Sequence, residues 1–246
     1  MSQYLYNPSD SWPFRISRSK IDLFLKCPRC FYLDRKLGIR RPSFPPFTLN
    51  SAVDNLLKNE FDLLRKNGQR HKLMEKYGIE AFPYNHPNLS EWRDDHYNYV
   101  GASVLHQPTN LQICGIIDDI WVNNKEELII VDYKATSTNK EISLDDKYKK
   151  YYKKQIEIYQ WIFRQKDFKV SDMSYFVFAN ADRNRSEFDG KLNFKLSIVP
   201  YEGDASWVEN TIFEIKKCLD SPEFPIPTED CEYCSYRKRS SQKENF

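Results

Sequence analysis

The chain has 246 residues, of which 40% are hydrophobic and 29% are charged, which is enough to build one large folded domain. Its net charge of +2 excludes a protein that is basic overall, so any surface for nucleic acid must concentrate its positive charge locally. No stretch has the character of a signal peptide or a membrane span, so we expect a cytoplasmic protein with no membrane partner.

The N-terminal part of the chain is predicted to be helical after an irregular leader over residues 1–16. A helix is expected to begin at Ser19, because Asp22 follows it at the spacing of a capping box. Pro28 should kink or end that helix. Apolar residues recur at helical spacing over residues 51–66 and predict a second helix there.

The pattern changes to strands in the second half of the chain. Residues 69–97 carry little pattern and are interpreted as an insertion or a helical connector. Strands are expected over 99–105, 111–122, 127–134, 173–180 and 192–200, with helices over 145–165 and 207–219 and a fraying polar tail over 236–246. This order predicts an α/β fold in which a central sheet is flanked by helices, within one domain over residues 17–235.

Two acidic residues are expected to face each other on neighbouring strands. If the strands pair antiparallel around a turn centred on Lys125, Asp118 lies opposite Asp132, with side chains about 5 Å apart. Lys134 shares the face of Asp132, whereas Tyr133 points to the other face. A register shift of one residue would separate the two acids.

Facing carboxylates repel each other unless a cation lies between them, and Mg²⁺ or Mn²⁺ suits oxygen ligands. A lysine beside such an ion can orient or deprotonate a water, or stabilise charge on a phosphate. For an isolated Asp-x-Lys, an ordinary surface ion pair is the commoner explanation. Here Asp132 follows an apolar run and the facing strand carries a second acid, so the pattern favours hydrolysis of a phosphodiester.

The helix expected over residues 145–165 adds further polar groups. Gln155 and Tyr159 are spaced to share one helix face. Lysines alternate with tyrosines near the start of this helix, a mixture that can bind phosphates and stack on bases. The candidates for nucleic-acid contact are Lys149, Lys150, Lys153 and Lys154, although a solvated basic helix end explains any one of them equally well.

Two Cys-x-x-Cys pairs lie near opposite ends of the chain. Cys27 and Cys30 form one pair, and Cys231 and Cys234 form the other. Such spacing is typical of a four-thiolate metal site, and zinc is the ion that the spacing alone suggests. A bound metal would join the first helix to the C-terminal segment and would couple metal loading to folding.

Taken in order, these motifs resemble the RecB-like branch of the PD-(D/E)XK nucleases. That branch includes the CRISPR spacer-acquisition exonucleases and the nuclease domains of bacterial recombination helicase complexes. The similar elements are a helix with a Cys-Pro signature at 17–29, a Gly-x-x-Asp strand at 115–120, Asp132-Tyr133-Lys134, and a Gln-x-x-x-Tyr helix at 155–159. The resemblance implies a restriction-endonuclease-like core with a mixed sheet and metal-dependent hydrolysis of DNA. It also implies single strands or duplex ends as the partner, in repair, recombination or defence, and a helicase as a further partner.

The resemblance also implies roles for individual residues. Asp118 and Asp132 would hold Mg²⁺ or Mn²⁺ with the carbonyl of Tyr133, Lys134 would activate water, and Gln155 and Tyr159 would steady the site or contact DNA. The branch often places a [4Fe-4S] cluster on one N-terminal and three C-terminal cysteines. Here Cys30 would replace the missing third, with zinc as the alternative.

One position departs from the pattern of the branch, which usually places a metal-binding histidine on the second helix. Asp54 occupies the matching position, and Glu60 is a second candidate acid on the same helix. The alternatives to an active nuclease are therefore a nuclease-fold DNA-binding module that has lost catalysis, or a subunit that works inside a larger complex. The complete set of Asp118, Asp132 and Lys134 argues against lost catalysis.

Overall fold

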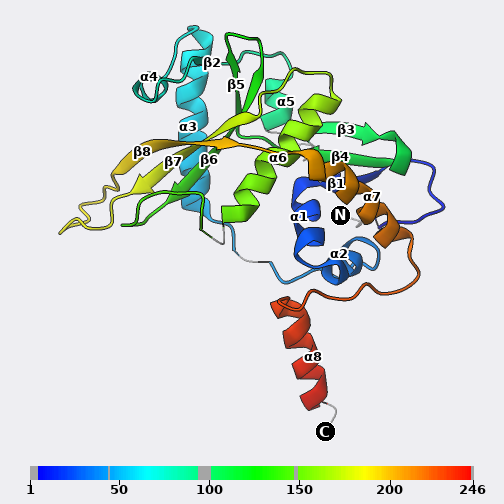
Figure 1. Cartoon of the computed structure of the whole chain (residues 1–246). Coiled ribbons are helices and arrows are strands. Elements are labelled where there is room, and N and C mark those ends of the chain that lie inside the picture. The colour runs from blue at the N-terminus through cyan, green and yellow to red at the C-terminus, as the bar shows by residue number, and fades with distance from the viewer. Residues whose placement is uncertain (1–4, 44, 94–100, 147–148, 245–246) are drawn as a thin grey trace. The chain divides into compact units, whose positions relative to one another are not determined.

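The computed structural model describes residues 5–43, 45–93, 101–146 and 149–244 (Figure 1). The chain forms two compact units. One comprises residues 1–45, 104–114 and 206–246, and the other comprises residues 46–103 and 115–205. The expectation of a single domain over 17–235 stays a prediction. Among the helices that the structure describes, none combines the length and apolarity needed to cross a bilayer.

The unit of residues 46–103 and 115–205 is built on a five-stranded mixed sheet. Its order is β2 (Ala81–Pro83), β5 (Asp119–Asn123), β6 (Leu128–Thr136), β7 (Met173–Ala181) and β8 (Phe194–Glu202). β6 and β7 are parallel, and the other neighbours are antiparallel. The helices of this unit are α3 (Thr48–Lys66), α4 (Lys72–Lys76), α5 (Leu89–Arg93) and α6 (Lys150–Gln165).

The two long helices cover opposite faces of this sheet, as Figure 1 shows for α3 and α6. The apolar stripe of α3 packs on the face that carries Trp121 and Val131, and the ring of Phe61 stacks on Trp121 at 5.5 Å. Each large apolar side chain buried in this way contributes roughly 1.5–3 kcal/mol. Because side chains alternate along a strand, Asp132 and Lys134 then point to the face that α6 covers.

The other unit holds most of a three-stranded sheet in the order β1 (Phe14–Ser17), β4 (Leu111–Gly115), β3 (Ala102–His106), with β1 parallel to β4. Its helices are α1 (Arg18–Lys26), α2 (Pro28–Arg35), the 3₁₀ helix η1 (Gln107–Thr109), α7 (Ser206–Asp220) and α8 (Glu232–Glu244). The Lys36 ammonium donates to the carbonyl oxygens of Leu219 and Ser221 at 2.7 and 2.6 Å and so satisfies the end of α7. The α/β class and the mixed sheet flanked by helices agree with the sequence prediction.

The strand expected over 111–122 is two strands in two different sheets. β4 ends at Gly115 and β5 begins at Asp119, so residues 116–118 lie between them. The carboxylate of Asp118 accepts a hydrogen bond from the backbone N–H of Tyr133 at 2.8 Å, so a side chain replaces a main-chain partner there. Because residues 111–122 are largely apolar, the sequence pattern did not indicate this break.

The ends of several helices and strands differ from the expected ones. A local sequence pattern carries little information about which distant segments pack beside it. β1 begins at Phe14, inside the segment expected to be irregular, because β4 supplies its hydrogen bonds. The capping box at Ser19 is wrong: the helix is capped at Ser17, and Asp22 instead accepts a hydrogen bond from Arg18 at 2.7 Å.

Three other stretches also differ from the prediction. Residues 236–244 of the tail expected to fray belong to α8, and no residue of that helix is buried. Residues 245–246 lie outside the described part of the chain. The poorly patterned stretch holds α4, α5 and the edge strand β2. The strand expected at 99–105 begins at Ala102, and residues 94–100 lie outside the described part of the chain.

Candidate active site

The β5–β6 hairpin has the register that the sequence predicts. Asp119 pairs with Val131 and Ile120 pairs with Ile130, so Asp118 follows alongside Asp132. The charge of Asp118 also acts on Asp132 and raises its pKa. Asp132 is 1% exposed, whereas Asp118 is half-buried and reaches solvent. The hairpin therefore presents two carboxyl groups on one face, one deep and one shallow.

Two groups hold the Asp132 side chain. Lys134 forms an ion pair with Oδ2, and the amide of Gln155 on α6 donates to Oδ1 at 2.6 Å. Among the described residues, Oδ2 has no hydrogen-bond donor of good geometry in addition to that ion pair. The Lys134 ammonium also lies over the ring of Tyr152, 4.7 Å from its centroid. The carboxylate is therefore fixed in place, with one oxygen facing positive charge.

Burial is the largest single influence on the pKa of both Asp132 and Lys134. Burial raises the pKa of Asp132, Lys134 opposes that change, and the nearby Asp118 adds to it. For Lys134, burial acts to lower the pKa, but the charges of Asp132 and Asp118 outweigh it and the pKa is raised. The ammonium of Lys134 therefore stays protonated at neutral pH and compensates the carboxyl groups.

Asp54 on α3 belongs to the same group of charges. Its pKa is raised, first by burial and then by the charge of Asp118. Its carboxylate pairs with Lys58 one helical turn later, at 2.8 Å. Glu60, the second candidate acid on this helix, pairs instead with Nε2 of His71 at 2.9 Å. Asp54 is thus the acid of α3 that lies in the electrostatic field of the hairpin.

Tyr159 and Tyr133, two other predicted site residues, make hydrogen bonds that hold the protein structure around the carboxylates. The hydroxyl of Tyr159 donates to the carbonyl oxygen of Ile116 at 2.6 Å, on the segment that leads into Asp118. The ring of Tyr133 points away from the carboxylate face, and its hydroxyl donates to Asp119 at 2.7 Å. Tyr159 therefore steadies the backbone before Asp118, and Tyr133 anchors the opposite face of the hairpin.

The lysines expected to contact nucleic acid lie in the first turns of α6. Lys149 donates to the carbonyl oxygen of Ser143 at 2.7 Å, and Lys153 lies 3.9 Å from Asp145. The ammonium of Lys150 lies over the ring of Tyr151 at 5.1 Å. These cations gather at the positive end of the helix dipole, where an anion is favoured.

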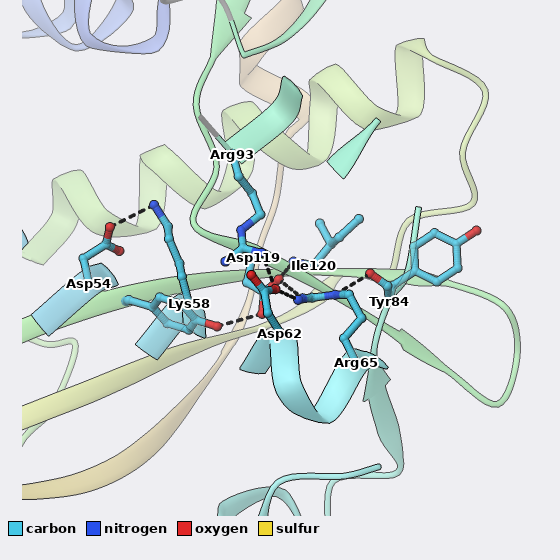
Figure 2. A network of polar contacts seen from close by, with 9 residues as sticks. Asp54, Lys58, Asp62, Arg65, Tyr84, Arg93, Asp119 and Ile120 are labelled. Atoms are coloured by element: carbon cyan, nitrogen blue, oxygen red, sulfur yellow. Dashed lines mark hydrogen bonds and ion pairs between the residues drawn. The ribbon is translucent and has the colours of Figure 1, made fainter. Parts of the chain in front are cut away.

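A buried ion network supports the hairpin from its other face, and sequence reasoning missed it (Figure 2). Asp119 is fully buried, and it accepts hydrogen bonds from Arg65, from the N–H of Ile120 at 2.9 Å and from Tyr133. Arg65 also donates to Asp62 and, at 2.7 Å, to the carbonyl oxygen of Tyr84. A signal was present: Arg65 occupies the apolar stripe of α3, four residues after Phe61.

The donor set suits a hard divalent cation. Asp54, Asp118 and Asp132 offer carboxylate oxygens, the ligands that Mg²⁺ and Mn²⁺ prefer. They do not converge as closely as the ligands of one ion; among the described residues, only the four cysteines form such a set of three or more. Lys58 and Lys134 instead compensate two of the acids. Positive charge is therefore already present beside Asp54 and Asp132, where a bound cation would also supply it.

The four cysteine thiols cluster in the unit that contains both chain ends. Their Sγ atoms lie 3.8 Å apart for Cys27 and Cys234, 3.7 Å for Cys30 and Cys231, and 3.6 Å for Cys30 and Cys234. All four lie within 4.8 Å of one another. The guanidinium of Arg41 donates to Sγ of Cys231 at 3.4 Å and places positive charge beside the thiols. The cluster can hold a metal.

Comparison with known proteins places the chain in a family. A comparison with curated proteins gave no match. The solved structure described as "Crystal structure of SSO0001" is 15% identical, with 94% of this chain and 87% of that chain covered and a TM-score of 0.40, a likeness that carries no argument about function. The model of the PD-(D/E)XK nuclease superfamily matches residues 47–239. Because that match covers most of the chain, the protein belongs to the PD-(D/E)XK nuclease superfamily.

Proposed function

We propose that this protein is a divalent-metal-dependent nuclease of the RecB-like branch that hydrolyses DNA phosphodiester bonds. The superfamily generally hydrolyses such bonds in nucleic acids. The observation that carries the proposal is the convergence of Asp118, Asp132 and Lys134 on one face of the β5–β6 hairpin. The resemblance of the motifs adds DNA repair, recombination or defence as the setting, and a helicase as a partner.

The residues that would hold Mg²⁺ or Mn²⁺ are Asp118, Asp132, the carbonyl of Tyr133 and Asp54. When bound, the ion would polarise the phosphate and acidify a water molecule. Asp54 supports this assignment although the branch uses histidine there, because its carboxylate offers the same kind of oxygen ligand as the two hairpin acids. The charge of Asp118 raises the pKa of Asp54, so the two carboxyl groups lie within electrostatic range of each other.

The chain's own groups would prepare the site for the reaction. Gln155 holds Oδ1 of Asp132, so Oδ2 keeps its orientation toward the Lys134 ammonium. Lys134 carries a positive charge at that oxygen and is suited to stabilise negative charge that develops on a phosphate. Tyr152 restrains the Lys134 ammonium through its ring, and Tyr159 restrains the backbone before Asp118.

A binding module without catalysis is the second candidate function. One observation favours it: Lys58 and Lys134 pair with Asp54 and Asp132, so these acids have counter-charges without a metal. A protein that only binds nucleic acid would need nothing more. A protein that cuts must exchange at least one of these pairs for a cation.

We further propose that the four cysteines bind one zinc ion rather than the [4Fe-4S] cluster that the resemblance implies. Four thiolates arranged tetrahedrally at about 2.3 Å from zinc lie roughly 3.8 Å from one another. Three of the six Sγ separations, at 3.6 to 3.8 Å, match that figure, and all six lie within 4.8 Å. A cluster places four irons and four sulfides between its ligands and so requires a wider set of thiolates.

The test of the nuclease proposal is cleavage of single- and double-stranded DNA with Mg²⁺ or Mn²⁺. Lys134→Ala should lower the single-turnover rate on the order of 100-fold or more, because it removes a buried charge at the reacting group. Lys72→Ala is the matched control, since Lys72 is an exposed lysine on α4 of the same unit. Equal cleavage by all three proteins would remove Lys134 from the mechanism, and no cleavage by the wild type would support the binding module.

A further inference from the structure

We propose that a groove beside α3 binds a strand of the nucleic acid next to the candidate active site. The groove has a volume of about 810 Å³ and lies between the outer face of α3 and the segment of residues 85–93, and we call it the α3 groove. That volume is within the range of roughly 300–1,000 Å³ that is usual for ligand sites. The inference extends the proposed function, because it assigns a binding surface to residues outside the candidate catalytic set.

The charges of the α3 groove favour a phosphate-bearing ligand. Lys58, Arg65, Lys66 and Arg93 contribute positive charge to its lining, and Asp62 is the acid there. Asp62 is already shared between Arg65 and Arg93, the latter at 2.6 Å, so it leaves little negative charge to repel an anion. Lysine and arginine contacts to phosphates supply most of the sequence-independent affinity for nucleic acid.

Amide and hydroxyl groups complete the lining and suit the bases and sugars of a strand. Asn55 and Asn59 lie on α3, and Asn85 and Ser90 lie on the facing segment. An asparagine amide both donates and accepts, so it can hydrogen-bond to base edges of a strand that is not paired. An apolar protein partner would leave these amides without matching groups. The mixture therefore fits nucleic acid better than an apolar protein surface.

The basic floor of the α3 groove is preorganised. Arg65 and Arg93 are 8% and 7% exposed, and Figure 2 shows their side chains converging near Asp62. Arg93 also has a buried Nε without a hydrogen-bond partner among the described residues. Groups held in this way lose little conformational freedom when a ligand binds. The floor therefore needs no rearrangement, and because Asp62 and Asp119 balance its arginines, the exposed Lys66 is the cation of the lining that would meet a phosphate.

One side chain links the α3 groove to the candidate catalytic acids. Lys58 lines the groove and pairs with Asp54, and Asp54 responds to the charge of Asp118 (Figure 2). A strand lying in the groove would thus lie one lysine side chain away from Asp54. We infer that the groove positions the part of the strand that flanks the bond to be cut.

The test is binding of a short fluorescein-labelled single-stranded DNA, followed by anisotropy without added Mg²⁺ or Mn²⁺, where metal-dependent cutting is blocked and the cysteine site keeps its metal. Lys66→Ala should weaken binding several-fold and reduce the slope of log affinity against log salt by about 0.7, the value for one phosphate contact on a single strand. Asn59→Ala should weaken binding without changing that slope, because it removes a neutral contact. Both residues are exposed, so neither variant should affect folding.

Lys72→Ala is the matched control, because it removes one exposed lysine of the same unit outside the α3 groove. The inference is overturned if Lys66→Ala and Lys72→Ala bind alike, or if the wild type does not bind the labelled strand without added Mg²⁺ or Mn²⁺. Binding that depends on Lys66 in a protein that never cuts with Mg²⁺ or Mn²⁺ would support the groove and refute the nuclease proposal. The two failures can therefore be told apart.

Discussion

The backbone N–H of Tyr133 donates a 2.8 Å hydrogen bond to Oδ2 of Asp118, on the strand that faces it. The side chain of Asp118 therefore continues the hairpin beyond the last main-chain pair, between Asp119 and Val131. One carboxylate oxygen is used to hold the neighbouring strand, so Oδ1 is the atom that we propose would bind a metal. The same residue thus has a structural role and a proposed metal-binding role.

Two substitutions of Asp118 should separate these roles. Asp118→Asn keeps an oxygen that can accept from Tyr133, so the free energy of unfolding should change little while Mn²⁺ affinity falls. Asp118→Ala removes the acceptor as well and should also lose about 0.5–1.5 kcal/mol of stability. Urea unfolding and titration with Mn²⁺ measure the two effects. If Asp118→Asn binds Mn²⁺ as the wild type does, Asp118 is not a ligand.

The buried ion network should be worth more to folding than its exposed member. Asp119→Asn removes the fully buried counter-charge of Arg65 and leaves only the exposed carboxylate of Asp62 to pair with it, which should cost about 3–5 kcal/mol. Asp62→Asn is the control, because the Asp62 side chain is 48% exposed and its loss should cost about 1 kcal/mol or less. Urea unfolding in EDTA measures both. Similar losses for the two variants would show that the network does not stabilise the hairpin.

The sequence predicted the hairpin well because its information is local. The turn near Lys125 set the register, and alternation along the strands then placed Asp118, Asp132 and Lys134 on one face. The supports of that face were harder to predict. Arg65 and Asp119 are separated by 54 positions in the sequence, and no periodic pattern reports such a pair.

The missed elements depended on partners distant in sequence as well. β1 exists because β4 lies beside it, and the break after Gly115 reflects a change of sheet that hydrophobicity does not signal. The α3 groove could not be predicted either. Its lysines and asparagines look like the ordinary solvent face of an amphipathic helix until the segment of residues 85–93 is placed opposite them.

The stability of the metal-free protein should fall as the pH rises through the range in which Asp132 titrates. The unfolded chain loses this proton near the ordinary pKa of about 3.9, whereas burial raises the pKa of Asp132 in the folded state. Between those values the folded state binds more protons than the unfolded state, so its advantage is present at low pH and is lost on going upward.

Asp132→Asn does not titrate, and it should lack this part of the pH dependence. The measurement is the free energy of unfolding in EDTA for the wild type and for the variant across that range. A difference between the two proteins that stays constant with pH would contradict the raised pKa. A wild type that gains stability relative to the variant as the pH rises would reverse its sign.

The metal of the cysteine cluster should be zinc and should stabilise the unit that contains it. Cys231→Ser removes one of four thiolates and should lower the unfolding temperature and the bound zinc together, because metal affinity contributes directly to folding. Cys218→Ser is the matched control from the same unit. Burial raises the pKa of Cys218 to about 11, so this thiol stays protonated at neutral pH and is not expected to bind metal.

Colour and elemental analysis of the purified wild type decide the identity of the metal. A colourless protein with one zinc per chain, lost on treatment with a strong chelator, is the expected result. A brown protein whose broad visible absorbance disappears on reduction or chelation would establish an iron–sulfur cluster. The sulfur separations of 3.6 to 3.8 Å would then have to widen on loading, which would mean that cluster insertion reshapes the segments around Cys30 and Cys234.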